Sequence, residues 1–69
     1  MYSILIKIKN CRSIRWYYLK NEDGTVYVED DLLKVQDKVR HLLNDYLLSD
    51  IQVIKNYIIT EDVTIEEVI

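Results

Sequence analysis

The chain has 69 residues, a single cysteine, no proline and a formal net charge of −3. A chain of this length forms one domain, residues 1–69, and buries only a small core. One cysteine, Cys11, excludes a disulfide scaffold and is typical of a reducing compartment. No stretch approaches the roughly 20 apolar residues of a membrane span, and the apolar run at residues 2–8 is too short for a secretory signal. We therefore expect a cytoplasmic protein that has no membrane-spanning segment.

The first part of the chain has the alternating pattern of half-buried strands. Residues 2–9 are the first predicted strand and residues 14–20 the second, joined by a four-residue turn at 10–13. Asp23-Gly24 is the clearest turn signal in the chain, because glycine accepts the positive φ that a tight hairpin requires. Residues 25–28 follow as a short third strand. These three strands are expected to form an antiparallel β-meander.

Residues 29–48 are the one convincing amphipathic helix in the sequence. Its apolar face carries, at helical spacing, Leu32, Val35, Val39, Leu42, Leu43 and Tyr46. Asp30 is the best N-cap by residue type. Leu33 lies off the apolar arc, and we expect it to pack against Val28. The apolar face must be buried, so the helix is expected to pack on one face of the sheet.

Residues 51–60 are predicted as a fourth strand, long and apolar enough to lie inside the sheet. A small hairpin at residues 55–56 is the alternative, although its arms would be too short. Thr64 and Glu67 match a capping box, whereas the β-branched residues 63–65 favour a short fifth strand or an extended tail.

The expected fold class is therefore α+β, with the order β-β-β-α-β and a short C-terminal fifth strand left open. A right-handed crossover sets the fourth strand parallel to the third or parallel to the first, and we prefer the place beside the first. The small core and the apolar fourth strand also suggest a homo-oligomer, formed by pairing of that strand at a sheet edge.

Charge is divided unevenly along the chain. Residues 1–20 contain five basic residues and no acid, whereas residues 21–69 contain four basic residues and twelve acids. The two parts thus carry charges of +5 and −8. This division gives a basic and an acidic candidate contact surface.

The basic candidate binding face consists of Lys7, Lys9, Arg12, Arg15, Tyr17 and Tyr27. On the expected register, Lys7, Lys9 and Arg15 share the sheet face away from the helix, near Tyr17. Basic residues interleaved with aromatic rings on an open sheet face bind single-stranded nucleic acid in several proteins. The plainer interpretation is an ordinary solvated sheet face, which antiparallel sheets often have.

The acidic candidate contact consists of Glu61, Asp62, Glu66 and Glu67. These acids alternate with apolar residues, which is unlike a purely solvating tail. They are expected either to contact a basic partner or to dock on the protein's own sheet, where they would neutralise the basic strands.

The sequence offers little support for catalysis or for a cofactor. His41, the only histidine, lies on the polar face of the predicted helix, remote from Ser49 and Cys11. Gly24 is the only glycine, so a glycine-rich phosphate loop is excluded. The acids lack the alternating spacing of a calcium loop. We expect no enzymatic activity, no catalytic residues, no metal and no cofactor.

The resulting functional prediction is a small non-enzymatic protein–protein interaction module. The codon bias implied by the residue usage suggests an AT-rich genome, so a phage or mobile-element accessory protein that acts on a host factor fits. The partner is then a protein of unknown identity, with a homo-oligomer as a further expectation. The alternative is a small single-stranded nucleic-acid-binding domain that uses the basic and aromatic sheet face. An overall acidic domain is repelled by a polyanion, which makes nucleic acid the less favoured partner.

Overall fold

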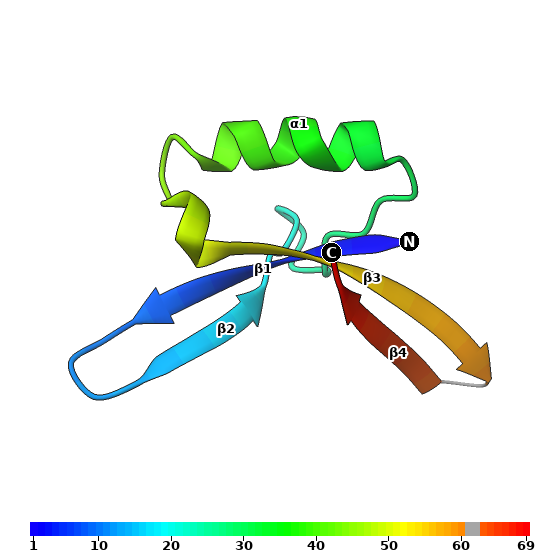
Figure 1. Cartoon of the computed structure of the whole chain (residues 1–69), viewed down its shortest axis with the longest axis horizontal. Coiled ribbons are helices and arrows are strands. Elements are labelled where there is room, and N and C mark those ends of the chain that lie inside the picture. Colours follow the sequence, from blue (N-terminus) through cyan, green and yellow to red (C-terminus); the bar gives the residue numbers. More distant parts are fainter. Residues whose placement is uncertain (61–62) are drawn as a thin grey trace.

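The computed structural model describes residues 1–60 and 63–69, with side-chain surroundings for residues 1–56 and 67–69. Within these residues the chain forms one helix, a short 3₁₀ turn and four strands in one open sheet (Figure 1). The elements are β1 (Tyr2–Lys9), β2 (Ile14–Tyr18), α1 (Leu32–Leu42), η1 (Leu48–Asp50), β3 (Ile51–Thr60) and β4 (Val63–Val68). The strand order is β2-β1-β3-β4, and each neighbouring pair is antiparallel. The predicted α+β class is confirmed.

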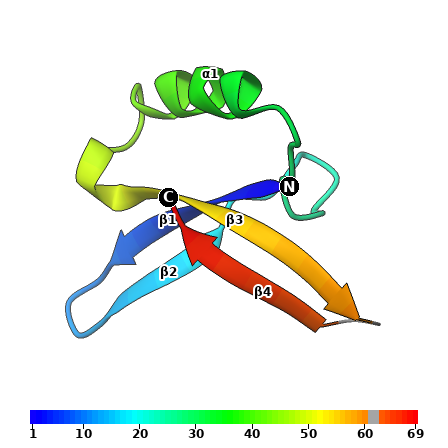
Figure 2. The ribbon, with the colours of Figure 1, turned by 45° about the vertical axis from the view of Figure 1, so that its right-hand side comes forward.

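Helix α1 lies across one side of the sheet, and the β1–β2 and β3–β4 hairpins diverge beneath it (Figure 2). Ile4 and Ile6 of β1 form the buried core cluster together with Val35 of α1. Val39 and Leu42 pack against this cluster, as their shared helical arc predicts, because residues three and four apart lie on one helix face. Leu43 is largely exposed, so it contributes less to the core than expected.

The segment expected as a third strand does not form one. The turn before it is present: Gly24 has a φ of 88°, and its amide donates to Asn21 O at 3.0 Å. Beyond this turn, residues 25–28 make only an isolated bridge, between Val26 and Lys20. The chain then pairs Glu29 with Tyr2 on β1, through backbone bonds of 2.7 and 2.9 Å. Glu29 therefore joins the same edge of β1 that β2 borders, and the loop between β2 and Glu29 adds no strand to the sheet. The prediction of a three-stranded meander is wrong beyond β2.

β3 lies beside β1, as preferred from the sequence, but it is antiparallel to β1 and not parallel. Ile51 pairs with Ile6, and Lys55 pairs with Tyr2. Since no third strand intervenes, the crossover that contains α1 starts from β2. β2 and β3 are consequently parallel to each other on either side of β1. One strand fewer before the helix therefore reverses the direction of the strand after it.

Helix α1 is shorter at both ends than the predicted 29–48. Asp31 is the N-cap, and its Oδ1 accepts a hydrogen bond from Leu33 N at 2.9 Å, so the prediction of Asp30 is wrong. The carboxylate of Asp30 lies instead 3.7 Å from the amino group of Met1. Leu33 is 74% exposed, which contradicts its expected packing against Val28.

The N-cap assignment predicts different effects for two neighbouring acids. Asp31→Ala should lower the free energy of unfolding by about 1 kcal/mol, because the amide of Leu33 loses its acceptor. Asp30→Ala is the matched control and should change it by less than about 0.5 kcal/mol, since its ion pair is exposed. Urea denaturation of both variants checks this. A larger loss for Asp30→Ala than for Asp31→Ala would contradict the assignment.

Candidate functional site

The sheet face opposite α1 carries a cluster of basic, aromatic and acidic side chains. The register places Lys7 opposite Trp16 and Lys9 opposite Ile14 on this face. The Nζ atom of Lys7 lies 5.4 Å from the centre of the Trp16 ring, within the range of a cation–π interaction. Trp16 therefore takes the position beside the lysines that the sequence analysis gave to Arg15 and Tyr17.

Asp50 forms ion pairs with both lysines of this face, so its single negative charge offsets one of their two positive charges. Its Oδ1 lies 3.5 Å from Lys7 Nζ and 3.9 Å from Lys9 Nζ, and the Asp50 side chain is only 17% exposed. Asp50 ends η1 and directly precedes β3, which pairs with β1, so the sheet brings it beside Lys7. Sequence reasoning missed this residue, because the pairing of β1 with β3 that places it was expected in the opposite direction.

Arg15 and Tyr17 lie on the other face of the sheet. Arg15 is opposite Ile8 and Tyr17 is opposite Ile6, whose side chain belongs to the core cluster under α1. The physical reason is the length of the β1–β2 loop. It has four residues and is closed by the pair of Lys9 and Ile14, so odd-numbered residues of β1 lie opposite even-numbered residues of β2. The expected grouping of Lys7, Lys9, Arg15 and Tyr17 on one face is therefore wrong.

The remaining members of the basic candidate face are also separated. Arg12 is exposed in the β1–β2 loop, where its amide donates to Asn10 Oδ1 at 3.1 Å. Tyr27 is half-buried and packs against the core cluster, with Lys38 Nζ 5.6 Å from its ring centre. Burial raises the pKa of Tyr27, and the charge of Glu29 raises it further. The six residues do not form one surface.

The acidic candidate contact can be placed only in part. Glu61 and Asp62 lie outside the described residues. Glu66 is in β4 at the register position opposite Asn56, and the exposed Glu67 is opposite Lys55. Both acids of this set that the structure places therefore lie in β4, beside β3.

An apolar cleft of about 330 Å³ opens between α1, the start of β3 and the end of β4. It is lined by Leu32, Val35, Gln36, Val39, Leu48, Ile51, Gln52, Val53, Val68 and Ile69. Three of its residues are strongly exposed: Leu48, Val68 and Ile69. Two pairs of adjacent apolar residues could have indicated the cleft from the sequence. They are Leu47-Leu48, after the main apolar face of the predicted helix, and Val68-Ile69.

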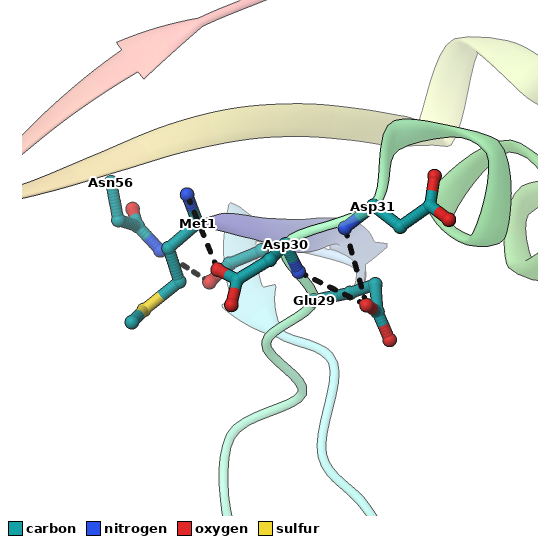
Figure 3. Close-up of polar contacts among 6 residues, drawn as sticks. Met1, Glu29, Asp30, Asp31 and Asn56 are labelled. Carbon is teal, nitrogen blue, oxygen red and sulfur yellow. Dashed lines mark hydrogen bonds and ion pairs between the residues drawn. The ribbon is translucent and has the colours of Figure 1, made fainter.

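A cluster of polar contacts lies where the chain enters α1 (Figure 3). Oε1 of Glu29 accepts hydrogen bonds from the amides of Asp30 and Asp31, at 3.1 and 3.2 Å. The amide of Asn56 in β3 donates to Met1 O at 2.8 Å. The backbone pairing of Glu29 with Tyr2 and the ion pair of Asp30 with the amino group of Met1 hold residues 29–31 against the start of β1, so the cluster supports the position of the helix above the sheet.

In the part of the chain whose side chains the structure describes, His41 and Cys11 lie apart and do not converge on a reactive centre. His41 is exposed, as expected, with Nδ1 2.9 Å from the backbone oxygen of Asp37, and Cys11 is exposed in the β1–β2 loop. Among the described residues, no three His, Cys, Asp or Glu side chains lie close enough together to hold a metal ion. No helix in this part of the chain has the length and apolar character to cross a membrane.

Comparison with known proteins finds no matching family model, no curated protein and no solved structure with significant similarity to this chain. A function is therefore inferred from the surfaces of the molecule.

Proposed function

We propose that this chain is a non-enzymatic protein–protein interaction module that holds a partner protein in the apolar cleft between α1 and β3. The observation that carries the proposal is the cleft itself, about 330 Å³ of apolar-lined space beside a small core. Large exposed apolar patches on small soluble proteins mark surfaces that another molecule covers.

The composition of the cleft favours a protein over a small polar ligand. Gln36 and Gln52 are the polar residues of its lining, whereas small-molecule sites use several convergent polar groups to fix a ligand. The apolar surface also continues past the cleft to Leu47, which directly precedes the lining residue Leu48 and is 68% exposed. An extended apolar surface with a polar surround matches the core and rim of protein interfaces.

Affinity capture with two matched variants tests the proposal. Leu48→Asp places a charge at the cleft, whereas Leu33→Asp places the same charge at an equally exposed leucine outside the lining. We expect the tagged wild-type chain and Leu33→Asp to capture the same partner from native cells, and Leu48→Asp to lose it. Equal capture by both variants, or no partner enriched by the wild type, would count against the proposal.

The arrangement of the basic residues predicts that the protein does not bind single-stranded nucleic acid usefully. Asp50 already offsets one of the two charges of Lys7 and Lys9, and Arg15 lies on the opposite face. Phosphate contacts are strongest at low salt, so a fluorescence titration with labelled oligonucleotides at about 50 mM salt is the most sensitive check. We expect no complex in the micromolar range. A micromolar complex that Trp16→Ala weakens would support the nucleic-acid alternative instead.

A further inference from the structure

The outer edge of β2 is open to another strand. Within the described residues, β2 pairs with β1 alone, so its other side is an edge of the sheet. The amide of Leu19 donates to Ile4 O, so by alternation the amides of Ile14, Trp16 and Tyr18 point away from β1. In Figures 1 and 2, β2 lies on the far side of β1 from α1, so the helix does not cover this edge.

Residues 51–60 are not an outer strand, which removes the edge pairing that the sequence suggested for them. They form β3, which pairs with β1 on one side and with β4 on the other. Chains that associate through a sheet edge do so through an outer strand. β2 is the outer strand whose side chains the structure describes throughout.

β2 carries large apolar and aromatic side chains that are exposed beside this open edge. Ile14, Trp16 and Tyr17 are all exposed. The strand contains no proline and no acid, and Arg15 is its only charged residue. Soluble proteins usually protect an outer strand with several charges, a proline or a bulge. An outer strand without this protection, with exposed aromatic rings, is suited to pair with a further strand.

A second copy of β2 is complementary to the first. Two antiparallel copies with their Trp16 residues opposite each other exchange backbone bonds at Ile14, Trp16 and Tyr18, the residues whose amides point outward. In this register, Ile14 lies opposite Tyr18 of the second copy, and Arg15 lies opposite Tyr17 of the second copy. Aromatic residues pair favourably across strands with each other and with β-branched residues. A guanidinium beside a tyrosine ring adds a cation–π interaction.

Other antiparallel registers of two β2 strands are less favourable. The outward amides alternate, so the copies can slide past each other only in steps of two residues. One such step sets Arg15 directly opposite Arg15 of the second copy, and like charges in this position are destabilising. The opposite step pairs only residues 16–18 of each β2 with each other. The register centred on Trp16 is the one that pairs all five residues of the strand.

We propose that two copies of this chain form a symmetric dimer in which their β2 strands pair antiparallel, centred on Trp16. The two four-stranded sheets then join into one continuous sheet, with both α1 helices on the same face. The contact uses the same edge of each copy, so the assembly closes at two copies. No residue of β2 lines the apolar cleft, so the dimer does not depend on the partner protein proposed for the cleft.

Analytical ultracentrifugation of the full chain over a wide concentration range tests the dimer. We expect the average mass to rise from 8.3 kDa toward twice that value and to stop there. Backbone hydrogen bonds and apolar contacts carry the association, so it should persist at about 1 M salt, where the screening length falls to about 3 Å. A mass of one copy at every concentration, or a mass that rises beyond two copies, would overturn the proposal.

Hydrogen exchange of the unmodified chain, followed residue by residue by NMR, locates the contact. The outward amide of Trp16 should exchange more slowly as the fraction of dimer rises, because it gains an acceptor in the second copy. The amide of Lys34, on α1 and away from this edge, should exchange at a rate that does not depend on concentration. A dimer in which the Trp16 amide gains no protection would place the contact elsewhere and overturn the proposal.

An exchange of two side chains tests the register. Tyr17→Arg sets two arginines opposite each other and should abolish the dimer, whereas Leu33→Arg adds the same charge at an exposed position of α1 and should retain it. The double variant Arg15→Tyr with Tyr17→Arg should restore the dimer, because each arginine again faces a tyrosine. Circular dichroism checks that each variant is folded. A dimer that Tyr17→Arg leaves as tight as the wild type, or a folded double variant that stays monomeric, would overturn the register.

Discussion

Ile4→Ala is expected to lower the free energy of unfolding by about 2–5 kcal/mol. Ile4 is fully buried at the middle of β1, where it packs with Ile6 and with Val35 of α1. Removing its side chain leaves a cavity at the contact between helix and sheet. The neighbouring strands β2 and β3 hold β1 on both sides, so the backbone cannot move to close the cavity.

The size of the domain makes this loss decisive. At typical values per residue, a chain of 69 residues has a total stability of about 3–10 kcal/mol, so Ile4→Ala should leave a large unfolded population. Leu33→Ala is the control, and it should be almost neutral because Leu33 is 74% exposed. Chemical denaturation followed by circular dichroism measures both. Equal midpoints for the two variants would show that the core is misassigned.

Asp50→Ala should produce the second large effect, a loss of about 1–3 kcal/mol. The carboxylate lies between Lys7 and Lys9 and is mostly buried, so its removal leaves two like charges close together without their shared counter-ion. Because the pair is only partly screened by solvent, the loss should persist in moderate salt but shrink in high salt.

Asp45→Ala is the matched control for Asp50→Ala. Asp45 follows α1 and is exposed, so the same change of charge should alter the free energy of unfolding by less than about 0.5 kcal/mol. Urea denaturation at low and high salt separates the two. If Asp50→Ala and Asp45→Ala lower the free energy of unfolding equally, the ion pairs of Asp50 with Lys7 and Lys9 do not stabilise the fold.

Local pattern was sufficient to predict much of the secondary structure. The strands at 2–9 and 51–60 have the predicted bounds, because alternating β-branched and apolar residues leave little competition from helix. For residues 63–68 a strand was only one of the alternatives left open, and the structure shows it as β4. The apolar face of α1 was predicted through Val35, Val39 and Leu42, since a period of 3.6 residues is a strong signal. The turn at Gly24 also follows from its residue type.

Features that depend on pairing between distant segments were not predicted. Residues 25–28 have strand-like composition, but the return of Glu29 to Tyr2 left them no edge to join. That one change reversed the direction of β3 relative to β1. The faces of Arg15 and Tyr17 could have been predicted, because the closing pair of the four-residue loop already sets the register.

The candidate site was predicted least well, for the same reason. Asp50 reaches Lys7 and Lys9 only through the pairing of β3 with β1. The apolar cleft is lined by residues of α1, β3 and the end of β4, which are far apart in the sequence, so no local pattern encodes it. The basic residues were visible in the sequence, and their division between two faces follows from the closing pair of the four-residue loop, which the prediction did not use.

Photo-crosslinking from the cleft tests the central claim most directly. A photoreactive residue is placed at Leu48, which lines the cleft, and in a second protein at Leu33, which is as exposed but lies outside it. After illumination in native cells, a docked partner predicts one discrete adduct with a different protein from position 48 and none from position 33. The same adducts from both positions, or no adduct from position 48, would contradict the claim that a partner protein occupies the cleft.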